Sequence, residues 1–171
     1  AYTRAADGAG VLRVRRAQAE GAGEGPAAAP AWCTLARELE RAGDTPSALS
    51  AWQTARARDP AQRDPRANEV RILEALGRVD EALDALVSYA NHPVAAGGDA
   101  GGLLVRAARI ALARGARDRA CELAERAKRF GPLDGELDAL LREMVERRAK
   151  KEREEREAAN PEPAKAAPAW I

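Results

Sequence analysis

The stretch "AWCTLARELERAGDTPSALSAWQTARARDP", residues 31–60, places apolar residues at helical spacing on both sides of a glycine. Trp32, Leu35 and Leu39 recur at steps of three or four, which puts them along one stripe of a first helix. Gly43 interrupts this pattern, and a second apolar stripe follows it. The stretch therefore predicts two helices joined by a tight turn at the glycine.

The second of these helices has its own start and stop signals. The Thr45 hydroxyl can cap its first turn, and Pro46 suits the first helical position because its missing N–H has no helical partner there. Ala48 and Trp52 form the inner stripe, where the small residue lets the helix axes approach and the large one fills the remaining space. Pro60 ends the helix.

The same arrangement returns twice, marked by Gly77 and Gly115, each followed by alanines and then a proline. Gly77 lies 34 residues after Gly43, whereas Gly115 follows 38 residues later, and the surplus falls in the glycine-rich stretch 91–102. The second copy carries Arg66 and Glu69 at the positions of Trp32 and Leu35. Its first helix is therefore expected to bury other residues, namely Val70, Leu73 and Leu76.

The motif Trp32-x2-Leu35-Ala36-x2-Leu39, with Gly43, Ala48, Trp52, Ala55 and Pro60, resembles the tetratricopeptide repeat, a helix-turn-helix unit of about 34 residues. Ala36, Leu39 and Trp52 stand where the family has glycine, tyrosine and phenylalanine. The resemblance covers about residues 29–132 and implies three repeats, at 31–60, 63–93 and 101–132. The expected fold is all-α, a short right-handed α-solenoid of three helix pairs.

The flanking segments differ in kind. Residues 1–30 are predicted to be an N-terminal arm and a Gly/Ala/Pro linker, in which "VLRVRRAQAE" is a short helix or an extended arm. Residues 133–159 predict a helix whose apolar start caps the array and whose continuation is almost wholly charged. The apolar residues are Leu137, Leu140, Leu141, Met144 and Val145. Residues 160–171 are expected to be an extended tail, because their prolines cannot be helical.

Composition narrows the possible partners. The 28 basic and 27 acidic residues give a net charge of +1, so no overall field favours nucleic acid or an anionic membrane. No apolar run approaches the roughly 18 residues of a membrane helix, so we expect no direct membrane insertion by the given chain. Cys33 and Cys121 have neither a CxxC pattern nor a histidine companion, which predicts two free, partly buried thiols and no metal site.

Catalytic constellations are lacking in the sequence. The single histidine, His92, lies in a glycine-rich connection, and the carboxylates are interleaved with arginine on helix faces. The glycines match neither a phosphate loop nor a dinucleotide fingerprint. We therefore expect a protein that is not an enzyme and has no cofactor, metal or small-molecule substrate.

Three arginines recur at one repeat position. Arg37, Arg71 and Arg109 each precede their glycine by six residues, and the family resemblance implies that this position faces the concave groove. Glu40 and Glu74 follow three residues later in the first two copies, but Leu112 takes that place in the third. Either Arg37–Glu40 and Arg71–Glu74 are internal surface pairs, or the arginines form a ladder for a partner's carboxylates, strongest at Arg109.

The sequence predicts a non-enzymatic scaffold that binds protein partners within a larger assembly. We expect a structural subunit or assembly factor, with a reversible adaptor for acidic or C-terminal carboxylate segments as the alternative. Trp170 and Ile171 are expected to anchor the tail in trans. The excess of alanine and arginine indicates a bacterial source. The chain starts at Ala1 without methionine, so a missing N-terminal segment is expected and the cytoplasm and periplasm both stay open.

Overall fold

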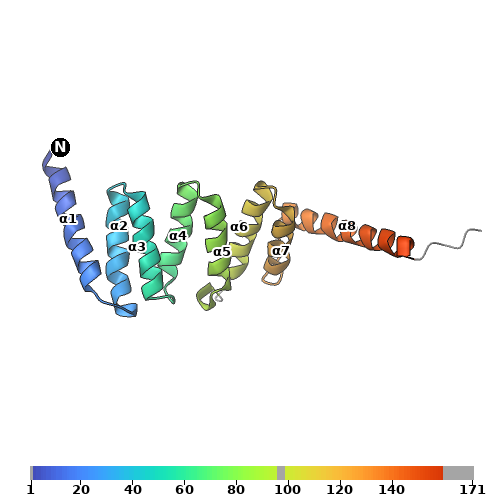
Figure 1. Ribbon diagram of the computed structural model, residues 1–171, viewed down its shortest axis with the longest axis horizontal. Helices are drawn as coiled ribbons and strands as arrows, with labels where there is room; N and C mark the ends of the chain where they lie inside the picture. Colours follow the sequence, from blue (N-terminus) through green and yellow to red (C-terminus); the bar gives the residue numbers. More distant parts are fainter. Residues whose placement is uncertain (1, 96–98, 160–171) are drawn as a thin grey trace, which may run out of the picture.

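The structure, a computed structural model, describes residues 2–95 and 99–159. Within these ranges the fold is all-α, and Figure 1 shows α1 to α7 standing side by side in a row, with α8 projecting from the far end. The helices are α1 (Tyr2–Gly21), α2 (Ala29–Arg41), α3 (Thr45–Arg58), α4 (Arg63–Ala75), α5 (Val79–Asn91), α6 (Asp99–Ala113), α7 (Arg117–Ala127) and α8 (Gly135–Ala159). Short 3₁₀ turns, Pro26–Ala28 and Pro93–Ala95, precede α2 and α6.

Three helix pairs, α2–α3, α4–α5 and α6–α7, are each joined at one of the glycines found in the sequence. All three have a backbone in the left-handed region, with φ of 81° at Gly43, 69° at Gly77 and 76° at Gly115. In the first turn the Gly43 N–H donates to the Glu40 carbonyl at 3.0 Å, and the Asp44 N–H donates to the Leu39 carbonyl at 2.9 Å. The other two turns repeat this pattern, which ends a helix and requires a residue without Cβ strain.

The start of α3 differs from the expectation. Asp44, not Thr45, is the N-cap, because its carboxylate accepts a hydrogen bond from the Ser47 N–H at 3.2 Å while Thr45 is already the first helical residue. Hydrogen bonding from the side chain and the backbone of Ser47 lowers the pKa of Asp44. Pro46 is the second helical residue and not the first as predicted, but its missing N–H still lacks a helical partner there.

The apolar interior of the described chain divides into two large clusters and a small third one, which consists of Tyr89, Ala95 and Ala100. One joins α1 to α5 and contains Trp52, which is only 1% exposed, together with Ile72 and Leu73. The other runs from α4 to α8 and is built around Leu86, Leu104 and many alanines of α6 and α7. Ala85 of α5 packs against both. Small residues at the helix contacts allow the close packing that the alanine-rich composition predicts.

The first helix of the second pair, α4, buries two charged side chains, although only apolar residues of this helix were expected to be buried. Arg66 and Glu69 of α4 are 7% and 6% exposed, although they stand at the positions of a tryptophan and a leucine in the first pair. Val70 and Leu73 are buried as predicted, but Leu76 is 37% exposed, so that part of the prediction is wrong. Leu76 follows the last residue of α4, where the chain turns away from the core.

Glu69 is held by side chains from the preceding pair. Its carboxylate accepts a hydrogen bond from Gln53 Nε2 at 3.1 Å and lies 2.9 Å from Nε of Arg56. Arg66 donates from Nε to the Pro60 carbonyl at 3.3 Å. Burial and the neighbouring Arg56 lower the pKa of Arg66. Two arginines, one glutamate and a glutamine thus form a polar cluster between α3 and α4.

The N-terminal segment was predicted to be an arm and a linker, but most of it is helical. Residues 2–21 form the single helix α1, which packs on α2 through Leu12 and Ala19. The predicted linker is also too long, because Ala28 and Ala29 are fully buried and α2 begins at Ala29. Alanine side chains are small enough to fit where two helices contact each other, so this alanine-rich stretch packs against the helices although its composition is typical of a linker.

Helix α8 caps the array with its first half. Leu137, Leu140, Leu141 and Met144 are buried, whereas Val145 is 61% exposed, contrary to the prediction. In the charged outer half, Lys150 pairs with Glu154 at 3.8 Å and Lys151 with Glu155 at 3.6 Å. The predicted tail, with Trp170 and Ile171, lies outside the described residues.

Candidate partner-binding surfaces

The three recurring arginines lie on the first helix of each pair, Arg37 on α2, Arg71 on α4 and Arg109 on α6. Their side chains are 51%, 53% and 59% exposed. Each keeps about half of its surface accessible although it is engaged in an ion pair. We call this set the arginine row.

The carboxylates that pair with this row come from other helices or, for Asp134, from the residue before α8. Arg37 meets Asp64 at 3.4 Å, Arg71 meets Glu40, and Arg109 meets Asp134 at 2.8 Å. Glu74, in turn, pairs with Arg106. The ion pairs therefore connect successive helix pairs of the array.

Both sequence interpretations of the arginines need correction. Arg37–Glu40 and Arg71–Glu74 do not form within their helices, because Glu40 and Glu74 turn toward arginines about one repeat later. Arg109 was expected to lack a competing carboxylate, yet Asp134, which precedes α8, fills that role. The spacing within one helix could not show these contacts, since they depend on how the pairs stack.

A small hollow of about 270 Å³ lies beside the first two arginines of the row and is lined by Arg37, Glu40, Arg41, Trp52, Asn68 and Arg71. Trp52 Nε1 donates to Glu40 at 2.7 Å, and the Arg37 guanidinium lies over the indole, 5.5 Å from its centroid. The aromatic face and the carboxylates hold these guanidinium groups in place. An incoming anion would have to compete with Glu40 and Asp64.

A second row of polar contacts connects α5 with the third helix pair. Asp84 pairs with Arg119 of α7 at 2.6 Å, and Asp80 pairs with Arg114, the residue that follows α6, at 3.0 Å. The sequence carries a signal for them that was missed: opposite charges recur 34 and 35 residues apart, which is one repeat. Successive second helices are thus connected in the same way as successive first helices.

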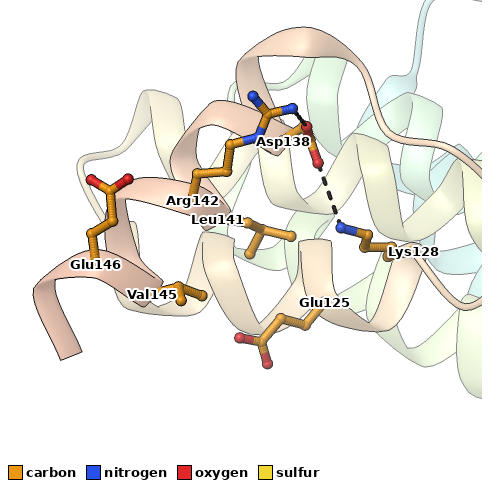
Figure 2. Close-up of a pocket in the computed structure, with 7 residues that line it drawn as sticks. All are labelled: Glu125, Lys128, Asp138, Leu141, Arg142, Val145 and Glu146. Atoms are coloured by element: carbon orange, nitrogen blue, oxygen red, sulfur yellow. Dashed lines mark hydrogen bonds and ion pairs between the residues drawn. The ribbon is translucent and has the colours of Figure 1, made fainter. Parts of the chain in front are cut away.

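A groove of about 500 Å³ lies between α7 and α8, and Figure 2 shows the side chains around it. Leu141 and Val145 of α8 form its apolar part. The charged rim consists of Glu125, Lys128, Asp138, Arg142 and Glu146. Asp138 meets Arg142 at 2.5 Å and Lys128 at 3.6 Å, and these contacts, Arg142 first, lower its pKa.

The groove could not be found from sequence. Its walls come from two helices, and the angle at which α8 leaves the array decides which side chains face each other (Figure 1). Val145 continues the apolar spacing of Leu137 and Leu141, so the sequence predicted burial for all three. The structure leaves Val145 exposed in the groove.

The cysteines provide no reactive centre. Cys33 and Cys121 are both buried, as free thiols, and burial raises the pKa of each. A raised pKa keeps a thiol protonated and therefore weakly nucleophilic. Over residues 2–95 and 99–159 no three His, Cys, Asp or Glu side chains are grouped so that they could hold a metal ion.

Within the described part of the chain, no helix combines the length and the apolar character needed to cross a membrane. The chain matches no model of a known protein family and no curated protein. Its function is therefore inferred from the arginine row, the α7–α8 groove and the projecting half of α8.

Proposed function

We propose that this protein is a non-enzymatic scaffold of tetratricopeptide-like repeats that serves as a structural subunit or assembly factor of a multiprotein complex. Three helix pairs joined by the same glycine turn support the repeat assignment. The observation that carries the functional proposal is the outer half of α8. From Val145 to Ala159 every residue is exposed, and the helix extends beyond the array (Figure 1).

This projecting arm, residues 146–159, buries nothing against the array. It rises about 21 Å, at 1.5 Å per residue over 14 residues. Pairs such as Lys150–Glu154 and Lys151–Glu155 support a helix in water by a few tenths of a kcal/mol each. The arm contacts the array through one exposed ion pair, Arg148 with Glu125 of α7 at 3.5 Å. Because the arm adds no apolar burial to the fold, we assign it to contacts with another subunit.

Three chain lengths test this assignment by capture of partners from the native source, with the stoichiometry measured. The full chain and a chain ending at residue 159 should capture a partner in a fixed ratio, whereas a chain ending at residue 147 should not. The melting temperature should match for all three, because the arm lies outside the core, and the helical circular dichroism signal should fall only in proportion to the residues of α8 that are removed. If the chain ending at residue 147 still captures the partner, the contact lies elsewhere. If the chain ending at residue 159 already fails to capture it, the contact belongs to residues 160–171. If no chain captures a partner in a fixed ratio, the proposal is wrong.

A reversible adaptor is the second candidate, and the half-exposed arginine row favours it. An acidic segment could take the place of Asp64 and Glu40 at Arg37 and Arg71, exchanging one carboxylate for another. Such binding is expected to be substoichiometric and sensitive to salt.

The two candidates separate with a triple substitution of Arg37, Arg71 and Arg109 to glutamine. An adaptor loses affinity for its partner, while a subunit held by the arm does not. The matched control is Arg114→Gln with Arg119→Gln, which removes two similar ion pairs between α5 and the third helix pair. If both variants weaken binding equally, the loss reflects net charge and not the arginine row.

A further inference from the structure

Helix α1 lies on the first helix pair through few contacts (Figure 1). Among residues 8–21, Leu12 and Ala19 are the side chains that pack on the apolar cluster of the array. No ion pair or side-chain hydrogen bond joins residues 8–21 to α2 or α3, whereas ion pairs connect the first helices of the three pairs. Helix α1 is therefore held to the array less firmly than the helix pairs are held to each other.

Two hollows separate α1 from the array. The larger, of about 520 Å³, is lined by Gly8, Ala9, Val11 and Leu12 of α1 and by Glu38, Arg41 and Ala42 at the end of α2. No atom of another helix comes within 4 Å of the place where a Cβ would stand at Gly8. Glu38 and Arg41 pair with each other at 2.6 Å, so the rim carries no net charge and the space suits apolar side chains.

The smaller hollow, of about 190 Å³, lies beside Trp32. It is lined by Arg16 and Glu20 of α1, by Trp32, Leu35 and Leu39 of α2, and by Ser47, Ser50, Ala51 and Thr54 of α3. Trp32 Nε1 is buried without a hydrogen-bond partner in the described chain, although Glu20 lines the same hollow. A buried donor that lacks an acceptor destabilises the closed arrangement. Helix α1 thus covers this face of α2 and α3 without filling its space or satisfying its donor.

A glycine-rich connection joins α1 to the array. Gly23 and Gly25 have left-handed φ of 76° and 91°, and at both positions a Cβ would face open space. The connection is held by an ion pair between Glu24 and Arg58 at 3.2 Å, in which Glu24 is almost fully exposed. Ala28, where the packed array begins, is fully buried. Because glycine adopts many backbone conformations, α1 can swing about this connection while the array stays fixed.

We propose that α1 is a hinged cover, and that the face of α2 and α3 beneath it binds an amphipathic helix of a partner protein when α1 opens. A helix is the shape that this face accepts, because α1 itself lies on it (Figure 1). Large apolar side chains of the partner fill the hollow beside Gly8 and Ala9, and a carboxylate or amide oxygen accepts the N–H of Trp32. This face is separate from the projecting arm, so the proposal goes beyond the proposed function and does not depend on it.

Hydrogen exchange of the purified full chain, followed by mass spectrometry, tests the cover. Amides of α1 should exchange about tenfold or more faster than those of α2 and α3. Ala9→Leu should slow this exchange because it fills the larger hollow, and Leu12→Glu should speed it because it removes a contact with the array. Val14→Glu is the matched control: Val14 is 56% exposed on the same helix, so this variant should exchange like the wild type.

The probe for the covered face is a fluorescently labelled peptide of residues 2–21 that carries Gly8→Leu and Ala9→Leu. Fluorescence anisotropy measures its affinity for each full chain. Because binding requires α1 to leave, the affinity should be about tenfold higher for the Leu12→Glu chain than for the wild type and about tenfold lower for the Ala9→Leu chain. A control peptide that also carries Leu12→Glu should not bind.

Three results would overturn the proposal. The first is protection of α1 in the wild-type chain equal to that of α2 and α3, because α1 would then not open separately. The second is equal affinity of the peptide for all chains, or no binding to the Leu12→Glu chain, because the covered face would then not be its site. The third is a wild-type dimer in sedimentation that Leu12→Glu abolishes, because α1 of a second copy would then occupy the face in place of a partner's helix.

Discussion

At the scale of single residues, Trp52 has the largest number of roles. Its ring lies in the apolar cluster that joins α1 to α5, its Nε1 donates to Glu40, and the Arg37 guanidinium lies over the face of the indole. Glu40 also pairs with Arg71 of the next helix pair. One side chain thus fills the interior and supports the position of two arginines.

Trp52→Ala is expected to lower the free energy of unfolding by about 3 to 5 kcal/mol, because it removes a large buried side chain and leaves a cavity. Urea melts of the isolated protein measure this loss. Trp52→Phe is the control: it keeps most of the volume but not the hydrogen bond to Glu40, so it should cost clearly less. A loss below about 1 kcal/mol for the alanine variant would contradict the tight packing around this residue.

At the scale of helices, the contact between α3 and α4 combines apolar packing with buried charge. Glu69 faces Gln53 and Arg56 across this contact, and Arg66 is buried beside them. A buried carboxylate tolerates this position because its oxygens are held by donors from the preceding pair. The cluster therefore ties the second pair to the first by specific polar contacts.

Glu69→Leu should destabilise the fold by about 3 kcal/mol, because it leaves Arg56 without the carboxylate with which it pairs. Adding Arg56→Met should restore much of that loss, since the second change removes the charge that the first left unpaired. Thermal melts of the two single variants and the double variant form the required cycle. Additive losses in the double variant would mean that the two side chains do not interact.

The helix pairs could be predicted from sequence because their signals are local. Gly43, Gly77 and Gly115 mark turns that depend only on neighbouring residues, and Trp52 follows the helical period. Contacts between pairs were missed, since burial of Glu69 depends on Gln53 and Arg56 in another helix. The same reason applies to the partners of the arginine row and to the exposure of Val145.

At the scale of the whole molecule, acid should weaken the fold. Asp44, Glu81, Asp134 and Asp138 all have a pKa held below its ordinary value, by hydrogen bonds to backbone N–H groups or by nearby cations. A lowered pKa in the folded state favours the ionised form. The resulting stabilisation is fully present above the unfolded pKa and is lost as pH falls toward the folded one.

The melting temperature is therefore expected to be steady near neutral pH and to fall below about pH 4, where free carboxylates begin to protonate. Asp134→Asn should show a smaller acid decrease than the wild type, because Asp134 accepts a hydrogen bond from the Leu137 N–H and pairs with Arg109. Melts monitored by circular dichroism across this pH range provide the measurement. A melting temperature unchanged down to about pH 2 would show that these carboxylates do not contribute.

The two large apolar clusters of the interior also bear on how the molecule responds to tension. The clusters adjoin along α4 and α5, where Ala85 packs against both. Force applied between α1 and α8 is carried by the two clusters in series, so each bears the full load. The cluster with the weaker resistance opens first and lengthens the chain, while the other stays folded until the tension rises again.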